Sequence, residues 1–359
     1  MAAFISAMLT WGTPSQARVT AIVTDSRAPA FGGVAVGSAG PYETLRGRVF
    51  GELDPADPHN AIIQDIQLAP KGANGKVPYI ATFQITKPVE MRLGNRLMVY
   101  EVSNRGGNAI PTNPGAIIPG AVYVQSGWQG DLLSQCTTAY PCISLNVPYN
   151  GPQQVIQVPV AANTDGSSIT GPVYGHIVSG TGTTQQMIIK STPVPYKPAS
   201  LDTKQASLWS LTSQTITGVD SPKTPIASSD WAWADCRSVP FPGAPDPTRI
   251  CLKDGFNPAL LYEMVFTAKD PLVLGVGYAA TRDVISFFHH ATADDHGTAN
   301  PLAGDIAKVI SIGQSQSGAF IRSSIHLGFN EDEALTLLNR HHSMGGRSSR
   351  RLHCPCPPS

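Results

Sequence analysis

This 359-residue sequence has few charged side chains, which make up 14% of it, against about 25% in a typical soluble domain. The 25 basic and 25 acidic side chains cancel, so no net charge attracts nucleic acid or an anionic membrane over a long range. A continuous apolar run as long as a membrane-spanning helix is absent too. We therefore expect neither a nucleic-acid partner nor a membrane span.

Cysteine is also sparse, with six in the chain. The two pairs in the middle of the sequence lack C-x-x-C spacing and have no histidine nearby, so we expect no metal. The spacing favours two local disulfides, Cys136–Cys142 and Cys236–Cys251, which would staple loops with little core of their own. Four cysteines allow several pairings, so the connectivity stays open at this point.

Glycine and proline, by contrast, are abundant at 34 and 31 residues, and they favour strands, turns and long loops over a helical bundle. The first residues form an apolar run, 2–11, followed by a small-x-small site, Ser15-Gln16-Ala17. This pattern is typical of a secretory signal peptide, which we predict at 1–17. The protein would then be secreted or periplasmic. A disordered or helical N-terminus is the alternative.

Strand-length apolar runs separated by Gly, Pro, Asp and Asn make the N-terminal part β-rich. The expected strands are 19–23, 45–53, 62–68, 77–85, 96–102 and 121–125. Residues 140 to about 260 form a loop-rich insertion, and a helical period of apolar residues appears at 279–290. This order of strands and helices predicts an α/β fold, with a mostly parallel sheet and helices across its faces.

The most informative segment is 308–318, where a short apolar strand runs into a turn of small residues around a serine, followed by a helix-like run. This is the order of a nucleophile elbow, a strained turn that presents a serine between a strand and a helix. The turn needs small residues two before and two after the serine, and Gly313 and Ser317 meet that requirement around Ser315. The flanks of Ser317 include no glycine. We predict that Ser315 is a nucleophile, with a plain strand–turn–helix as the alternative.

Further segments accompany this turn in a fixed order along residues 18–334. They are 30–33, 40–43, 51–58, 100–106, 127–131, 279–283 and 328–333. With the turn, they resemble the α/β-hydrolase superfamily, and within it a poorly characterised bacterial family called "alpha/beta hydrolase domain" proteins. The resemblance implies a serine hydrolase that acts on small-molecule carboxylic esters or related acyl compounds through an acyl-enzyme on Ser315. We expect no cofactor.

Acyl transfer also needs hydrogen-bond donors for the developing oxyanion. The N–H of Gln316, directly after the serine, is the first predicted donor. We expect the second from Arg105 and Gly106 in the loop 104–107, whose glycines let the backbone approach a substrate closely. A plain turn is the alternative for this loop.

The acid and the histidine of such a triad follow the serine along the chain, yet only 44 residues follow Ser315. The segment 335–359 is rich in arginine and histidine, contains Cys354 and Cys356, and has no strand period. We expect it to be an atypical, disordered tail left by a frameshift or truncation. On this hypothesis 18–334 is an incomplete hydrolase domain without its last strands, and this chain is inactive or impaired.

Several alternatives remain at this stage, and the sequence leaves the substrate and the oligomeric state open. A tail histidine is a rival catalytic base or metal ligand, and the segment 289–296 is a rival metal cluster. Arg282 and Asp283 are expected to form a structural ion pair.

A non-catalytic secreted binding protein is the alternative function, and a dead fragment is another. Either would use the tryptophans of the insertion for binding, whereas otherwise these tryptophans form the core of a small β subdomain. The residues concerned in all these alternatives are His341, His342, His353, His289, His290, Asp294, Asp295, His296, Trp209, Trp231 and Trp233.

Overall fold

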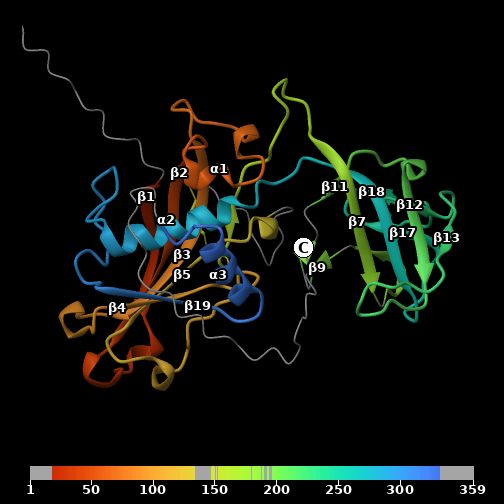
Figure 1. The fold of residues 1–359 in the computed structure, drawn as a ribbon. Coiled ribbons are helices and arrows are strands. Elements are labelled where there is room, and N and C mark those ends of the chain that lie inside the picture. Colours follow the sequence, from red (N-terminus) through yellow and green to blue (C-terminus); the bar gives the residue numbers. More distant parts are fainter. Residues whose placement is uncertain are drawn as a thin grey trace, which may run out of the picture.

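The computed structural model describes residues 18–133 and 147–331, apart from the single residues 150, 152, 179, 187, 190, 191, 194 and 195. The described chain forms two units that stand apart in Figure 1. The first unit is built on one mixed β-sheet with helices packed against it. The second unit consists of antiparallel strands from β7 to β18.

The sheet of the first unit runs in the order β1-β2-β3-β5-β4-β19, with β6 paired to β3. Strands β1, β2, β3 and β5 pair antiparallel, whereas β5, β4 and β19 pair parallel. The bounds are β1 Arg18–Pro29, β2 Tyr42–Leu53, α1 Pro58–Ala61, β3 Val77–Pro88, β4 Leu97–Glu101, β5 Val122–Ser126, β6 Ile156–Gln157, α2 Val276–His290, β19 Lys308–Ile312 and α3 Gln316–His326.

The predicted α/β fold, an α/β-hydrolase-like and mostly parallel sheet with helices across its faces, is therefore wrong. A parallel neighbour requires a crossover connection of a dozen or more residues, usually a helix. The segments 30–41 and 54–76 hold only short 3-10 turns and the four-residue α1, and the strands that they join are antiparallel. Among the described strands, parallel pairing is confined to β5, β4 and β19.

The strand predicted at 62–68 is also wrong, because these residues form turns and a 3-10 helix, Ile66–Leu68. Asp57 caps the preceding α1 by accepting a hydrogen bond from the His59 N–H at 2.8 Å, and Asp65 takes a left-handed conformation with φ 62°. Ile63 and Ile66 are nevertheless buried in the main core. The apolar run therefore reflects burial beneath a loop and not an extended strand.

Helix α2 crosses one face of the sheet (Figure 1) and confirms the helix predicted at 279–290. Val284 and Phe288 are fully buried, and the Phe288 ring meets the Phe83 ring of β3 edge-on at 5.4 Å between centroids. The same helix carries the predicted ion pair, with Arg282 Nε 2.9 Å from Asp283 Oδ1 and both side chains buried. This confirms a structural role for the pair.

All strand pairings of the second unit are antiparallel. A core of its own fills it, with Trp231, Trp233, Met264 and Phe266 buried. The bounds of its strands are β7 Thr170–Val178, β8 Gly182–Gln185, β9 Ile188–Ile189, β10 Thr192–Pro193, β11 Lys197–Pro198, β12 Ala206–Leu211, β13 Thr224–Ile226, β14 Trp231–Ala232, β15 Ala234–Asp235, β16 Ala244–Pro245, β17 Ile250–Phe256 and β18 Leu261–Lys269.

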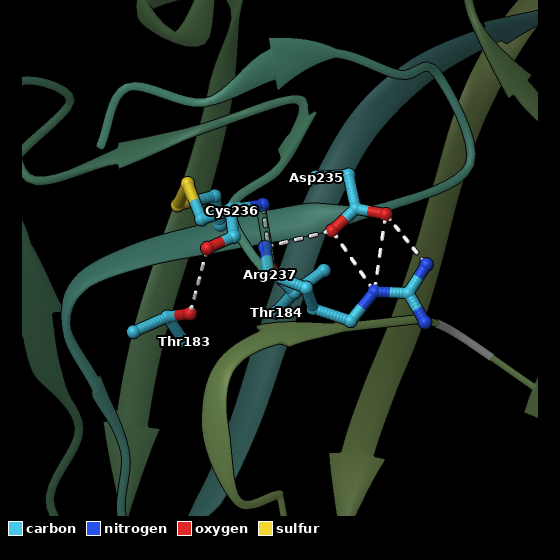
Figure 2. Close-up of a disulfide and its surroundings, with 6 residues drawn as sticks. Thr183, Thr184, Asp235, Cys236 and Arg237 are labelled. Atoms are coloured by element: carbon cyan, nitrogen blue, oxygen red, sulfur yellow. Dashed lines mark hydrogen bonds and ion pairs between the residues drawn. A yellow bond between two sulfur atoms is a disulfide. The ribbon is translucent and has the colours of Figure 1, made fainter. Parts of the chain in front are cut away.

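A disulfide joins Cys236 to Cys251 in this unit, as the spacing predicts, with the two Cα atoms 5.6 Å apart. Figure 2 shows its surroundings: the Cys236 N–H donates to Thr184 Oγ1 at 2.8 Å, and the neighbouring Arg237 pairs with Asp235. The bond therefore ties the loop after β15 to β17, where hydrogen bonds already hold that loop against β8.

Three predictions lie outside the described residues: the signal peptide at 1–17, the Cys136–Cys142 bond and the tail from 335 onward. The domain boundaries stay predictions as well. Among the residues that the structure describes, no helix is both long and apolar enough to cross a membrane.

Candidate functional site

The predicted nucleophile, Ser315, lies between the end of β19 and the start of α3. Figure 1 labels these two elements at one edge of the sheet. The backbone of Ser315 has φ 58° and ψ −120°, a conformation that residues other than glycine rarely adopt. Strain of this kind costs about 1–3 kcal/mol and persists only where the surrounding structure enforces it. The strand, the strained serine and the helix follow one another as in a nucleophile elbow.

Glycine is required two residues before this serine because the backbone of the turn folds back on itself. A Cβ placed on Gly313 would lie 2.7 Å from the carbonyl carbon and oxygen of Ser317. The tight approach thus confirms the physical reason for expecting a small residue at 313.

The structure also separates the two serines of the turn. Ser317 is buried, at 2% exposure, and its Oγ donates to the Gln314 carbonyl at 2.8 Å while accepting from the Gln314 N–H at 3.1 Å. Its hydroxyl therefore braces the turn. Ser315 is exposed and lines a pocket. Of the two, Ser315 is the serine that a substrate can reach.

The pocket beside Ser315 has a volume of about 650 Å³ and lies where the carboxyl ends of two parallel strands, β4 and β19, meet. Such ends are where open α/β sheets bind ligands, and this part of the sheet shares that geometry. No histidine lines it among the described residues. The lining residues are Glu101, Val102, Asn104, Gly107, Asn108, Ala109, Ile312, Gly313, Gln314, Ser315 and Ser317.

Glu101 is the one ionisable side chain of that lining. It ends β4 and is the register partner of Ile312, three residues before Ser315. Only 9% of the residue is exposed, and within the described chain its carboxyl has no hydrogen-bond or ion-pair partner. Burial raises the pKa of this carboxyl to about 7.

The predicted oxyanion donors are brought to the same place only in part. Gln316 is the first residue of α3, where backbone N–H groups have no acceptor within the helix. The N–H of Arg105 points elsewhere and donates to Gln129 Oε1 at 2.5 Å. Neither Arg105 nor Gly106 lines the pocket. The prediction that the Arg105 N–H is an oxyanion donor is therefore corrected, because that N–H already donates to the buried side chain of Gln129.

The loop 104–107 is nonetheless held against the serine turn. Asn104 Nδ2 donates to the Gln314 carbonyl at 3.3 Å, and the Arg105 guanidinium pairs with Asp131 at 2.5 Å in a buried position. Gly106 packs tightly, since a Cβ there would lie 2.6 Å from the Gln154 carbonyl oxygen. The loop contributes Asn104 and Gly107 to the pocket, one residue to either side of the predicted pair.

The rival sites do not form among the described residues. No group of histidine, cysteine and acidic side chains in this part of the chain is arranged to hold a metal ion. Asp294 instead anchors its own turn and β1, accepting from the N–H groups of His296 and Ile22 at 2.9 Å each. The tail histidines His341, His342 and His353 lie outside the described residues.

The tryptophans of the second unit are mainly core residues. Trp231 and Trp233 are 2% and 3% exposed and meet edge-on at 5.7 Å, so they cannot line a binding cleft. Trp209 is half-buried on β12.

Comparisons with family models, with curated proteins and with solved structures find no match to this chain. The functional argument therefore depends on the geometry of the site alone. Sequence reasoning missed Glu101 as a site residue, although an acidic residue at the end of a strand otherwise made of Leu, Met, Val and Tyr is a usable signal.

Proposed function

We propose that the protein is a serine hydrolase that cleaves carboxylic esters or related acyl compounds through an acyl-enzyme on Ser315. The observation that carries this proposal is the backbone of Ser315, held at φ 58° and ψ −120° between β19 and α3 and open to a pocket of about 650 Å³. A strained, exposed serine at a helix N-terminus is the arrangement that acyl transfer uses. The proposal depends on this local turn and not on the overall fold.

The chemistry requires a nucleophile, donors for the oxyanion and room for the acyl group at one place. Ser315 Oγ attacks the acyl carbon, and the developing oxyanion needs donors, of which the Gln316 N–H at the start of α3 is the nearest in sequence. The pocket supplies room for a small acyl group and is lined mainly by backbone and uncharged side chains. We therefore expect uncharged, short acyl esters as substrates.

The experiment is covalent labelling by a fluorophosphonate probe, which requires an activated serine. On this proposal the described pocket is sufficient for acylation, in place of the inactive or impaired chain expected from the missing histidine. Wild type is therefore expected to label, and Ser315→Ala is expected to lose the label. Ser324→Ala is the matched control, because Ser324 lies on the same helix and its Oγ donates only within it, to the Phe320 carbonyl at 3.0 Å. Equal labelling of wild type and Ser315→Ala would refute the assignment.

Binding by the second unit without catalysis is not favoured by any observation, because Trp231 and Trp233 are in its core. The Cys236–Cys251 bond supports an oxidising location, and we infer that the protein is exported to the periplasm or the exterior. Its presence in a periplasmic or culture-supernatant fraction would test this.

A further inference from the structure

Two ionisable or nucleophilic groups share the pocket at the ends of β4 and β19. Glu101 pairs in register with Ile312, and Ser315 follows Ile312 after a turn of two residues. The Val102 N–H donates to the Ile312 carbonyl at 2.9 Å, which fixes the end of β4 against the end of β19. The pairing of β4 with β19 thus places the carboxyl and the serine in the lining of one pocket.

The carboxyl of Glu101 is largely buried and stabilises no other group through a hydrogen bond or ion pair in the described chain. The residue is 9% exposed, its carboxyl makes no ion pair or hydrogen bond with the described residues, and it lines the pocket. Tyr123 on β5 is the titratable group that interacts with Glu101. Burial raises the pKa of Tyr123, the hydrogen bond that its hydroxyl accepts from the Ile118 N–H lowers it, and the charge of Glu101 raises it further. Neither group neutralises the other.

We propose that Glu101 is the proton acceptor of the Ser315 site. The inference rests on the proposed function and adds the base that a serine nucleophile needs. When Ser315 Oγ bonds to the acyl carbon, its O–H bond breaks and the proton passes to the Glu101 carboxylate, directly or through one water. When the bond from the acyl carbon to the leaving oxygen breaks, Glu101 returns that proton to the leaving alkoxide.

The protonation equilibrium suits this role, since a carboxyl that titrates near pH 7 is present in both forms at neutral pH. The carboxylate form is the acceptor, so the rate of acylation is expected to rise as pH increases through about 7. A positioned general base contributes about 10²–10⁴-fold to a rate.

The test measures the rate of fluorophosphonate labelling across this pH range for wild type, Glu101→Gln and Glu90→Gln. Glu90 is the matched control because its side chain is 57% exposed and lies away from the pocket lining. We expect Glu101→Gln to label about 100-fold more slowly and to lose the rise near neutral pH. Glu90→Gln should match wild type in both respects.

Two further measurements separate a chemical role from a structural one. The infrared band of a protonated carboxyl should titrate near pH 7 in wild type and in Ser315→Ala, and should be missing from Glu101→Gln. Added formate should accelerate the labelling of Glu101→Ala, because it replaces the lost carboxylate.

The outcomes distinguish the two proposals. If wild type does not label at any pH, the proposed function fails, and the role of Glu101 fails with it. If wild type labels and Glu101→Gln labels equally fast with the same pH profile, Ser315 stands and Glu101 is not its base. A slower Glu101→Gln that keeps the wild-type pH profile and is not rescued by formate in the alanine variant also overturns the inference.

Discussion

The two units of this protein each bury a glutamate, and they treat it in opposite ways. In the second unit Glu263 is fully buried among Tyr174, His176, Lys223 and Gln214, all of which donate to it or pair with it. Burial by itself raises the pKa of Glu263, and the hydrogen bonds from Lys223, Tyr174 and His176 outweigh it, so the net shift is downward.

Glu101 of the first unit has no such partners in the described chain, and burial alone moves its pKa upward to about 7. The difference teaches how to separate structural from functional acids. A buried carboxylate surrounded by donors completes a fold, whereas one that is left unpaired beside a pocket and a strained serine is available for chemistry.

The largest expected effect tests whether the two units are separate in stability. Trp231→Ala empties the middle of the second core and is expected to cost about 3–5 kcal/mol of unfolding free energy. Hydrogen exchange should show lost protection in β14, β17 and β18, while β1–β3 and the labelling of Ser315 remain as in wild type. Equal loss of protection in both units would mean that they unfold as one.

The second prediction concerns the pH dependence of stability that follows from Glu101. Its folded-state pKa is about 7, above the ordinary value of 4.5, so the folded protein binds the proton more tightly than the unfolded chain. The contribution of Glu101 to the unfolding free energy is therefore expected to fall by about 3 kcal/mol as pH rises from below 4.5 to above 7. Urea unfolding of wild type and Glu101→Gln at a series of pH values should show this fall in the difference between their unfolding free energies.

Glu263→Gln gives the opposite sign and serves as the comparison. The pKa of Glu263 is lowered, so its ionised form stabilises the fold above the ordinary pKa of a glutamate, and that stabilisation is lost as pH falls through the lowered folded-state pKa. If removing either glutamate changed the pH profile in the same direction, the contrast between the two acids would be wrong.

The smallest effect is expected at the brace of the serine turn. Ser317→Ala removes a buried hydroxyl that bonds both the N–H and the carbonyl of Gln314, at a cost of about 1–2 kcal/mol. Thermal unfolding should report this loss, while fluorophosphonate labelling of Ser315 continues. Complete loss of labelling in a folded Ser317→Ala would return the choice of nucleophile to an open question.

Much of the local structure was predictable, because it depends on neighbouring residues. The helix 279–290 follows from its apolar period, and the strand–turn–helix around Ser315 follows from small residues next to an apolar run. The Cys236–Cys251 bond follows from short spacing. The expected strand at 62–68 fails because burial under a loop produces the same apolar pattern as a strand.

The sheet direction was not predictable in this way, since it depends on which strands meet after the chain has turned back. The loop 104–107, which was predicted to supply an oxyanion donor, shows that hydrogen-bond partners distant in sequence are not predictable either. Its position beside the turn was expected, yet the side chain of Gln129, 24 residues away, decides that the Arg105 N–H is already bonded.

By itself, the sequence determined the serine turn: Gly313, Ser315 and Ser317 are close neighbours, and their small size allows the strained backbone between β19 and α3. Only the tertiary structure decided that Glu101 stands beside it. More than 200 residues separate the two in the chain, and the parallel pairing of β4 with β19 brings them to one pocket. The physical reason is that backbone strain is a local property, whereas burial and the pKa of a carboxyl depend on everything that packs around it.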